Sequence, residues 1–108
     1  MKAKKFKLER KIIEEVHDTL KTYLVKAKHI IAFIEIESPS DHHISNMLIL
    51  YSNSVLNYML ELEKLMIDGA SYYLVTADLV EKLNKHKKVL VELEEHLHIN
   101  SKYSLKVH

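Results

Sequence analysis

Residues 13–34 read IEEVHDTLKTYLVKAKHIIAFI, and the apolar residues of this stretch recur at alternating steps of three and four positions. An α-helix places residues with this spacing on one face, whereas a strand requires alternation with a period of two. The stretch therefore predicts an amphipathic helix over about residues 6–37. The expected buried seam consists of Ile13, Val16, Leu20, Tyr23, Ala27, Ile30 and Ile34.

The sequence SPSD at positions 38–41 predicts where this helix ends and where the next begins. Pro39 biases Ser38 away from helical dihedral angles, which favours termination of the first helix. Ser38 is suited to cap a second helix, Pro39 to occupy its first position, and Asp41 to complete a capping box.

Two further stretches repeat the helical spacing and predict helices over about residues 40–67 and 70–98. Gly69 lies between them and is free to take a left-handed conformation. The second seam comprises Ile44, Leu48, Tyr51, Val55, Tyr58, Leu62 and Leu65. The third comprises Thr76, Leu79, Leu83, His86, Leu90, Leu93 and Leu97.

Composition agrees with a fold made of a few long helices. The chain has 108 residues, with one Gly, one Pro and no Cys. So few turn-forming residues argue against a sheet protein, and the absence of Cys excludes disulfides and thiolate metal sites. We predict an all-α, up-down-up three-helix bundle over residues 1–98, followed by a C-terminal tail at 99–108 that can dock on it.

Residues 42–60, HHISNMLILYSNSVLNYML, contain no Lys, Arg, Asp or Glu in a chain that is 29% charged. The interspersed Ser and Asn side chains would be costly in hydrocarbon, so we expect no membrane span. The basic N-terminal run is not followed by the uninterrupted apolar region of a signal peptide, and we expect a cytoplasmic protein.

The same stretch carries a second apolar seam opposite the buried one, flanked by a polar stripe of Asn46, Asn53 and Asn57. A helix covered on one side only should be charged on the other side. We therefore predict a coiled-coil-like self-association, with a homodimer favoured because one self-complementary patch is enough. The predicted interface comprises Ile49, Asn53, Leu56, Asn57, Leu60 and Ile67. The alternative is that the tail, or irregular helix packing, covers this seam within one chain.

The first alternative function is nucleic-acid association through a basic N-terminal arm. The arm comprises Lys2, Lys4, Lys5, Lys7, Arg10 and Lys11. Lysines neutralise phosphates without reading sequence, and a single Arg gives little capacity for bidentate base contacts. The sequence pI of about 8.0 is modest for a dedicated nucleic-acid domain.

The second alternative function is a metal-binding bundle, because the chain has 8 histidines. The predicted topology brings one cluster of imidazoles and carboxylates to the same end of the bundle, and these groups suit Zn²⁺ or a similar ion. The cluster comprises Asp41, His42, His43, Glu95, His96 and His98. The competing interpretation is that these residues are solvated helix ends.

No Gly-rich phosphate loop and no Ser-His-Asp arrangement is recognisable in the sequence. We therefore predict no enzyme activity, no catalytic residue and no cofactor. The favoured function is that of a small oligomerisation or protein-interaction module, with a further protein partner as an option.

Overall fold

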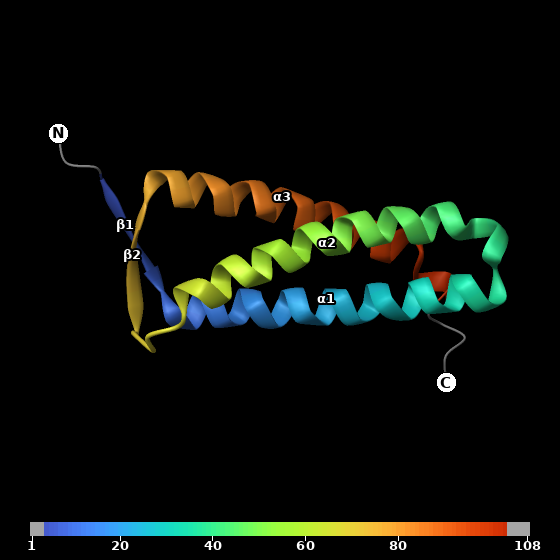
Figure 1. Cartoon of the computed structure of the whole chain (residues 1–108), viewed down its shortest axis with the longest axis horizontal. Coiled ribbons are helices and arrows are strands. Elements are labelled where there is room, and N and C mark those ends of the chain that lie inside the picture. Colours follow the sequence, from blue (N-terminus) through green and yellow to red (C-terminus); the bar gives the residue numbers. More distant parts are fainter. Residues whose placement is uncertain (1–3, 104–108) are drawn as a thin grey trace.

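The chain forms a mostly helical rod, seen in the computed structural model of Figure 1, which describes residues 4–103. Three helices, a two-stranded ribbon and two short 3₁₀ turns make up the described part. In chain order they are β1 (Lys5–Glu9), α1 (Arg10–Glu37), η1 (Pro39–Asp41), α2 (His42–Leu65), β2 (Tyr72–Thr76), α3 (Ala77–Ile99) and η2 (Ser101–Tyr103).

The helices run up, down and up, as the sequence predicts. Both α1 and α3 start at the ribbon end, and α2 returns between the opposite turn and the ribbon (Figure 1). The rod measures 57 × 27 × 18 Å along its principal axes. None of the helices within residues 4–103 is both long and apolar enough to cross a lipid bilayer.

The core follows the predicted seams. In α1, Ile13, Leu20 and Ile34 are at most 1% exposed, and in α2, Leu48 and Val55 are fully buried. The third seam is buried mainly near its C-terminal end, at Leu93 and Leu97. Its earlier members are half-buried, except Thr76, which is exposed. The buried positions of α3 therefore lie toward the end opposite the ribbon.

The predicted helix starts at residues 6 and 70 are wrong, because the chain forms the strands of the ribbon there. Residues 5–9 form β1, residues 72–76 form β2, and the two strands pair antiparallel from Lys5↔Thr76 to Glu9↔Tyr72. In KFKLE, polar and apolar residues alternate, so Phe6 and Leu8 share one face and the intervening charged residues take the other. Opposite them lie Val75, which is 4% exposed, and the half-buried Tyr73. This apolar face packs on the bundle, which favours the strand over a helix.

The third helix begins only at Ala77, because Thr76 caps it. The Thr76 hydroxyl oxygen accepts a hydrogen bond from the Leu79 backbone N–H at 3.2 Å. This bond satisfies one of the N–H groups that a helix start leaves unpaired.

The turn between α1 and α2 also differs from the prediction. Ser38 makes no side-chain cap, Pro39 opens a 3₁₀ turn, and α2 starts at His42 without a side-chain cap from Asp41. The Asp41 carboxylate instead accepts a 2.7 Å hydrogen bond from the Tyr103 hydroxyl. Gly69 adopts the expected left-handed conformation, with φ of 72°, although it lies beyond the cap of α2 at Met66.

The beginning of the predicted tail docks on the bundle. Tyr103 is 6% exposed, and its ring centroid lies 5.9 Å from that of Phe33. Residues 104–108, the remainder of that tail, lie outside the described residues.

Candidate functional site

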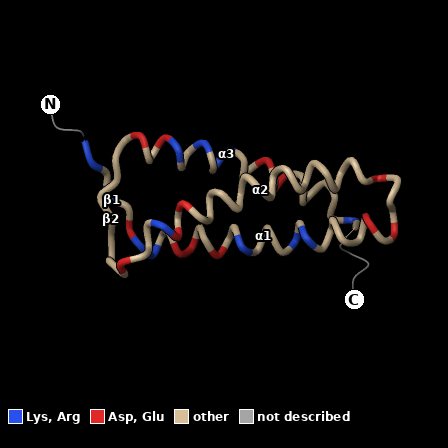
Figure 2. Tube along the Cα trace, in the orientation of Figure 1, with Lys and Arg blue, Asp and Glu red and all other residues tan. Residues whose placement is uncertain are grey.

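The side of α2 that faces away from α1 and α3 is uncharged and rich in apolar residues. We call it the α2 outer face and define it by Asn46, Ile49, Leu50, Asn53, Leu56, Asn57 and Leu60, all of which are exposed. At 100° per residue these positions span about 120° of the helix circumference. Figure 2 shows the same helix without a Lys, Arg, Asp or Glu through most of its length.

The apolar members of this face keep a large share of their surface in water. The exposed fraction is 69% at Leu50, 46% at Leu60, 45% at Leu56 and 41% at Ile49. Isolated exposed apolar residues are ordinary, but a contiguous exposed patch is typical of an interaction surface. The α2 outer face is therefore the strongest candidate site on the described chain.

Five of the six predicted interface residues lie together on this face, and Ile67 does not. Ile67 follows the end of α2, in the turn before β2, where it is 81% exposed. Leu50 was missing from the prediction, because the apolar seam opposite the buried one was traced only through spacings of seven and four. The three-residue step from Leu50 to Asn53 is the signal that identifies it.

The described tail does not cover the α2 outer face. Tyr103 docks against Phe33 and Asp41 instead, and the outer-face residues stay exposed with residues up to 103 in place. Within the described chain, the alternative in which the tail buries this seam is not realised.

Charged residues begin where the outer face ends, near the ribbon. Glu61 accepts a hydrogen bond from Lys82 of α3 at 3.0 Å, and Glu63 lies 2.8 Å from Nε2 of His17 in α1. The hydrogen bond from Lys82 lowers the pKa of Glu61. These contacts connect the last turns of α2 to its neighbours.

The predicted nucleic-acid arm is partly built into the ribbon. Lys4, Lys5, Lys7 and Lys11 are exposed, whereas Lys2 lies outside the described residues. The Lys7 ammonium sits 4.9 Å from the ring centroid of Tyr72. These lysines present positive charge on the outer side of β1 and the start of α1.

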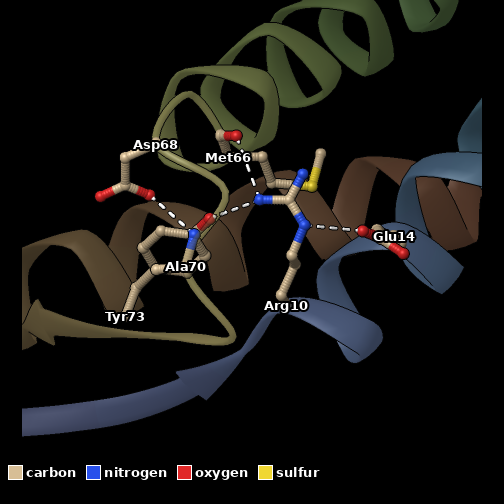
Figure 3. A network of polar contacts seen from close by, with 6 residues as sticks. All are labelled: Arg10, Glu14, Met66, Asp68, Ala70 and Tyr73. Atoms are coloured by element: carbon tan, nitrogen blue, oxygen red, sulfur yellow. Dashed lines mark hydrogen bonds and ion pairs between the residues drawn. The ribbon is translucent and has the colours of Figure 1, made fainter.

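Arg10, by contrast, is occupied by internal partners (Figure 3). Its Nε donates to Glu14 at 2.8 Å, while one terminal nitrogen donates to the Met66 carbonyl at 3.1 Å and to the Tyr73 hydroxyl at 2.8 Å. The guanidinium thus connects the start of α1, the end of α2 and β2. Its geometry is that of a structural anchor for the ribbon rather than of a free phosphate contact.

The predicted metal-binding residues do not assemble into one group. Asp41 is bonded to Tyr103, and the His96 ring stacks on Tyr51 with centroids 4.9 Å apart. His42, His43, Glu95 and His98 are exposed. Within residues 4–103, no set of three or more His, Asp or Glu side chains could hold a metal ion.

Comparison with known proteins finds no match to this chain. No family model matches the chain, and neither a curated protein nor a solved structure is significantly similar to it.

Proposed function

We propose that this protein is a non-enzymatic helical module that self-associates, with two copies pairing through the α2 outer face. The observation that carries the proposal is a run of exposed, uncharged positions along α2 that no described residue covers. Because neither copy brings a formal charge to the middle of the contact, like-charge repulsion does not oppose pairing there.

The free energy gained by burying the α2 outer face is of the size that a dimer requires. Full burial of one Leu or Ile side chain contributes about 1.5–3 kcal/mol, whereas lost freedom on association costs about 4–15 kcal/mol. Each copy offers four apolar side chains that are 41–69% exposed, so two copies together can offset a cost in this range. The asparagines in the face would fix the register.

An antiparallel pairing centred on Asn53 suits the face best. Leu50 and Leu56 lie three positions before and after Asn53, so they would meet across a two-fold axis. Lys64 continues the asparagine stripe, and its side chain is 71% exposed. A parallel pair would place the two Lys64 ammonium groups opposite each other, whereas an antiparallel pair separates them to opposite ends.

The direct test is the mass in solution, measured by light scattering at a low and a high protein concentration. Wild type is expected to reach the dimer mass, and the double variant Leu56→Asp/Leu60→Asp to remain a monomer. Val91→Asp is the matched control. Val91 is also an exposed apolar residue in the middle of a helix, with 56% exposure, but it lies on α3 and not on the α2 outer face. A wild-type chain that stays monomeric at the high concentration would remove the proposal.

A further inference from the structure

A second surface of interest is an apolar groove beside the ribbon, which we call the ribbon groove. Its volume is about 380 Å³, and it is bordered by both strands and all three helices. In Figure 1 the ribbon lies across the end of the bundle, and the first turns of α3 run apart from α1. The volume is within the range of about 300–1,000 Å³ typical of small-molecule sites.

The floor of the ribbon groove consists of buried apolar side chains. Ile13, Leu62 and Val75 are 1%, 2% and 4% exposed and all line it. Its rim includes Phe6 and Ile12, which are 37% and 49% exposed. An apolar floor with an apolar rim favours a hydrocarbon occupant over water.

The polar groups of the groove are few and carry no negative charge. Tyr58, Asn84 and Lys87 line it, and the described lining residues include no Asp or Glu. The Tyr58 hydroxyl is protonated at neutral pH and can donate a hydrogen bond, and burial raises its pKa above the ordinary value of 10.0. Lys7 also lines the groove, but its ammonium lies over the Tyr72 ring. Lys87 is the lining cation that makes no ion pair or hydrogen bond within residues 4–103.

From this arrangement we infer that the ribbon groove binds a single fatty-acyl chain that ends in a carboxylate. The chain lies on the apolar floor, and the carboxylate faces Lys87 and the amide of Asn84. A charged carboxylate would be repelled by acidic walls, and the lining supplies a cation and neutral donors instead. The inference does not rest on the dimer, because none of the outer-face residues of α2 lines the groove.

Chain length provides the first test, with isothermal titration of octanoate, decanoate and dodecanoate below their micellar concentrations. Burial of a methylene group should tighten binding by about fourfold for each methylene added, until the groove is full. Dodecanol, which lacks the charge, should bind without any contribution from Lys87.

Three variants locate the site. Val80→Trp fills the groove and should abolish dodecanoate binding, while Lys87→Glu should weaken it at least tenfold without affecting dodecanol. Lys88→Glu is the matched control, because Lys88 is the exposed neighbour outside the lining and should leave binding unchanged. The Leu56→Asp/Leu60→Asp variant should bind dodecanoate like wild type, which keeps this test separate from that of the dimer.

Absence of saturable dodecanoate binding would overturn the inference, as would equal losses in Lys87→Glu and Lys88→Glu. Binding to phosphatidylglycerol vesicles without binding to the monomeric alkanoates would also overturn it. That result would assign acyl recognition to a membrane surface instead of the groove.

Discussion

The Tyr103 hydroxyl donates a 2.7 Å hydrogen bond to the Asp41 carboxylate, and this bond joins the end of the described chain to the turn between α1 and α2. The two residues are separated by 62 positions in the sequence. The contact, together with the packing of Tyr103 on Phe33, holds η2 against the bundle and closes the end opposite the ribbon.

Tyr103→Phe removes one hydrogen bond to a charged acceptor. We therefore expect this variant to lower the melting temperature by several degrees. The hydrogen bond to Asp41 raises the pKa of Tyr103 above its ordinary value of 10.0, so folding favours the neutral phenol. This contribution is complete below pH 10.0 and is lost as the pH rises through the folded-state value. Thermal unfolding at neutral pH measures the difference, and Tyr72→Phe, at the exposed Tyr72, should show none.

Arg10→Lys is expected to loosen the ribbon, because an ammonium group cannot reproduce the fork that reaches Glu14, Met66 and Tyr73. Hydrogen exchange should then accelerate at the amides that pair β1 with β2, while the amides in the middle of α1 keep their protection. Lys11→Arg changes an exposed neighbour and serves as the control. Equal protection of the ribbon in both variants would show that Arg10 does not anchor it.

Asn53→Cys should form a symmetric disulfide between two copies if the pairing is antiparallel and centred on this residue. The wild-type chain contains no Cys, so each introduced thiol has one possible kind of partner. Leu50→Cys and Leu56→Cys should crosslink efficiently with each other but poorly with themselves, since their Cβ atoms must approach to about 4 Å. Mild oxidation followed by non-reducing electrophoresis distinguishes these cases. Strong self-crosslinking at every outer-face position would indicate a parallel pair instead.

His86→Phe should stabilise the fold. The His86 ring stacks on Tyr58, with centroids 5.3 Å apart and planes 11° apart, but its buried Nε2 has no hydrogen-bond partner within residues 4–103. Phenylalanine keeps the stacking and removes the unsatisfied atom, a gain of about 1 kcal/mol in the free energy of unfolding. Urea denaturation measures the gain, and His96→Phe is the control because His96 also stacks on a tyrosine but leaves no such atom.

The ion pair between Glu61 and Lys82 predicts a modest dependence of stability on pH. Its hydrogen bond lowers the pKa of Glu61, so folding favours the ionised carboxylate. The stabilisation is complete above the ordinary value of 4.5 and disappears as the pH falls through the lower folded-state value. Lys82→Met should therefore cost about 0.2–1 kcal/mol at neutral pH and low salt, and almost nothing once Glu61 is protonated. A cost that persists in strong acid would mean that Lys82 acts through packing.

Most of the helical architecture is readable from the sequence, because a three-four spacing of apolar residues determines which helix face is buried. The seams that contain Leu20, Leu48 and Leu93 predict three fully buried positions correctly. The exposed patch on α2 follows from the same reasoning, since a second apolar flank without charges has no place in a simple bundle. What occupies that flank is not encoded in spacing, so the pairing remains a proposal.

The ribbon was not predicted, although each strand has a local signal. KFKLE alternates between polar and apolar residues, and YYLVT is rich in aromatic and β-branched residues. Five residues are too few for either strand to be stable alone, and the pairing of Phe6 with Val75 joins distant parts of the chain. The role of Arg10 was missed for the same reason, because the Met66 carbonyl and the Tyr73 hydroxyl come near it only after folding.

The pairing of Lys5 with Thr76 also has a consequence for synthesis on the ribosome. β1 precedes α1 and α2 in the chain, so its partner β2 is translated only after both helices are complete. During that interval residues 5–9 have no strand to pair with, so the apolar side chains of Phe6 and Leu8 are open to contact with a neighbouring nascent chain. Once β2 is complete, it pairs with residues 5–9. Translation that stalls before Tyr72 should therefore leave an aggregation-prone fragment.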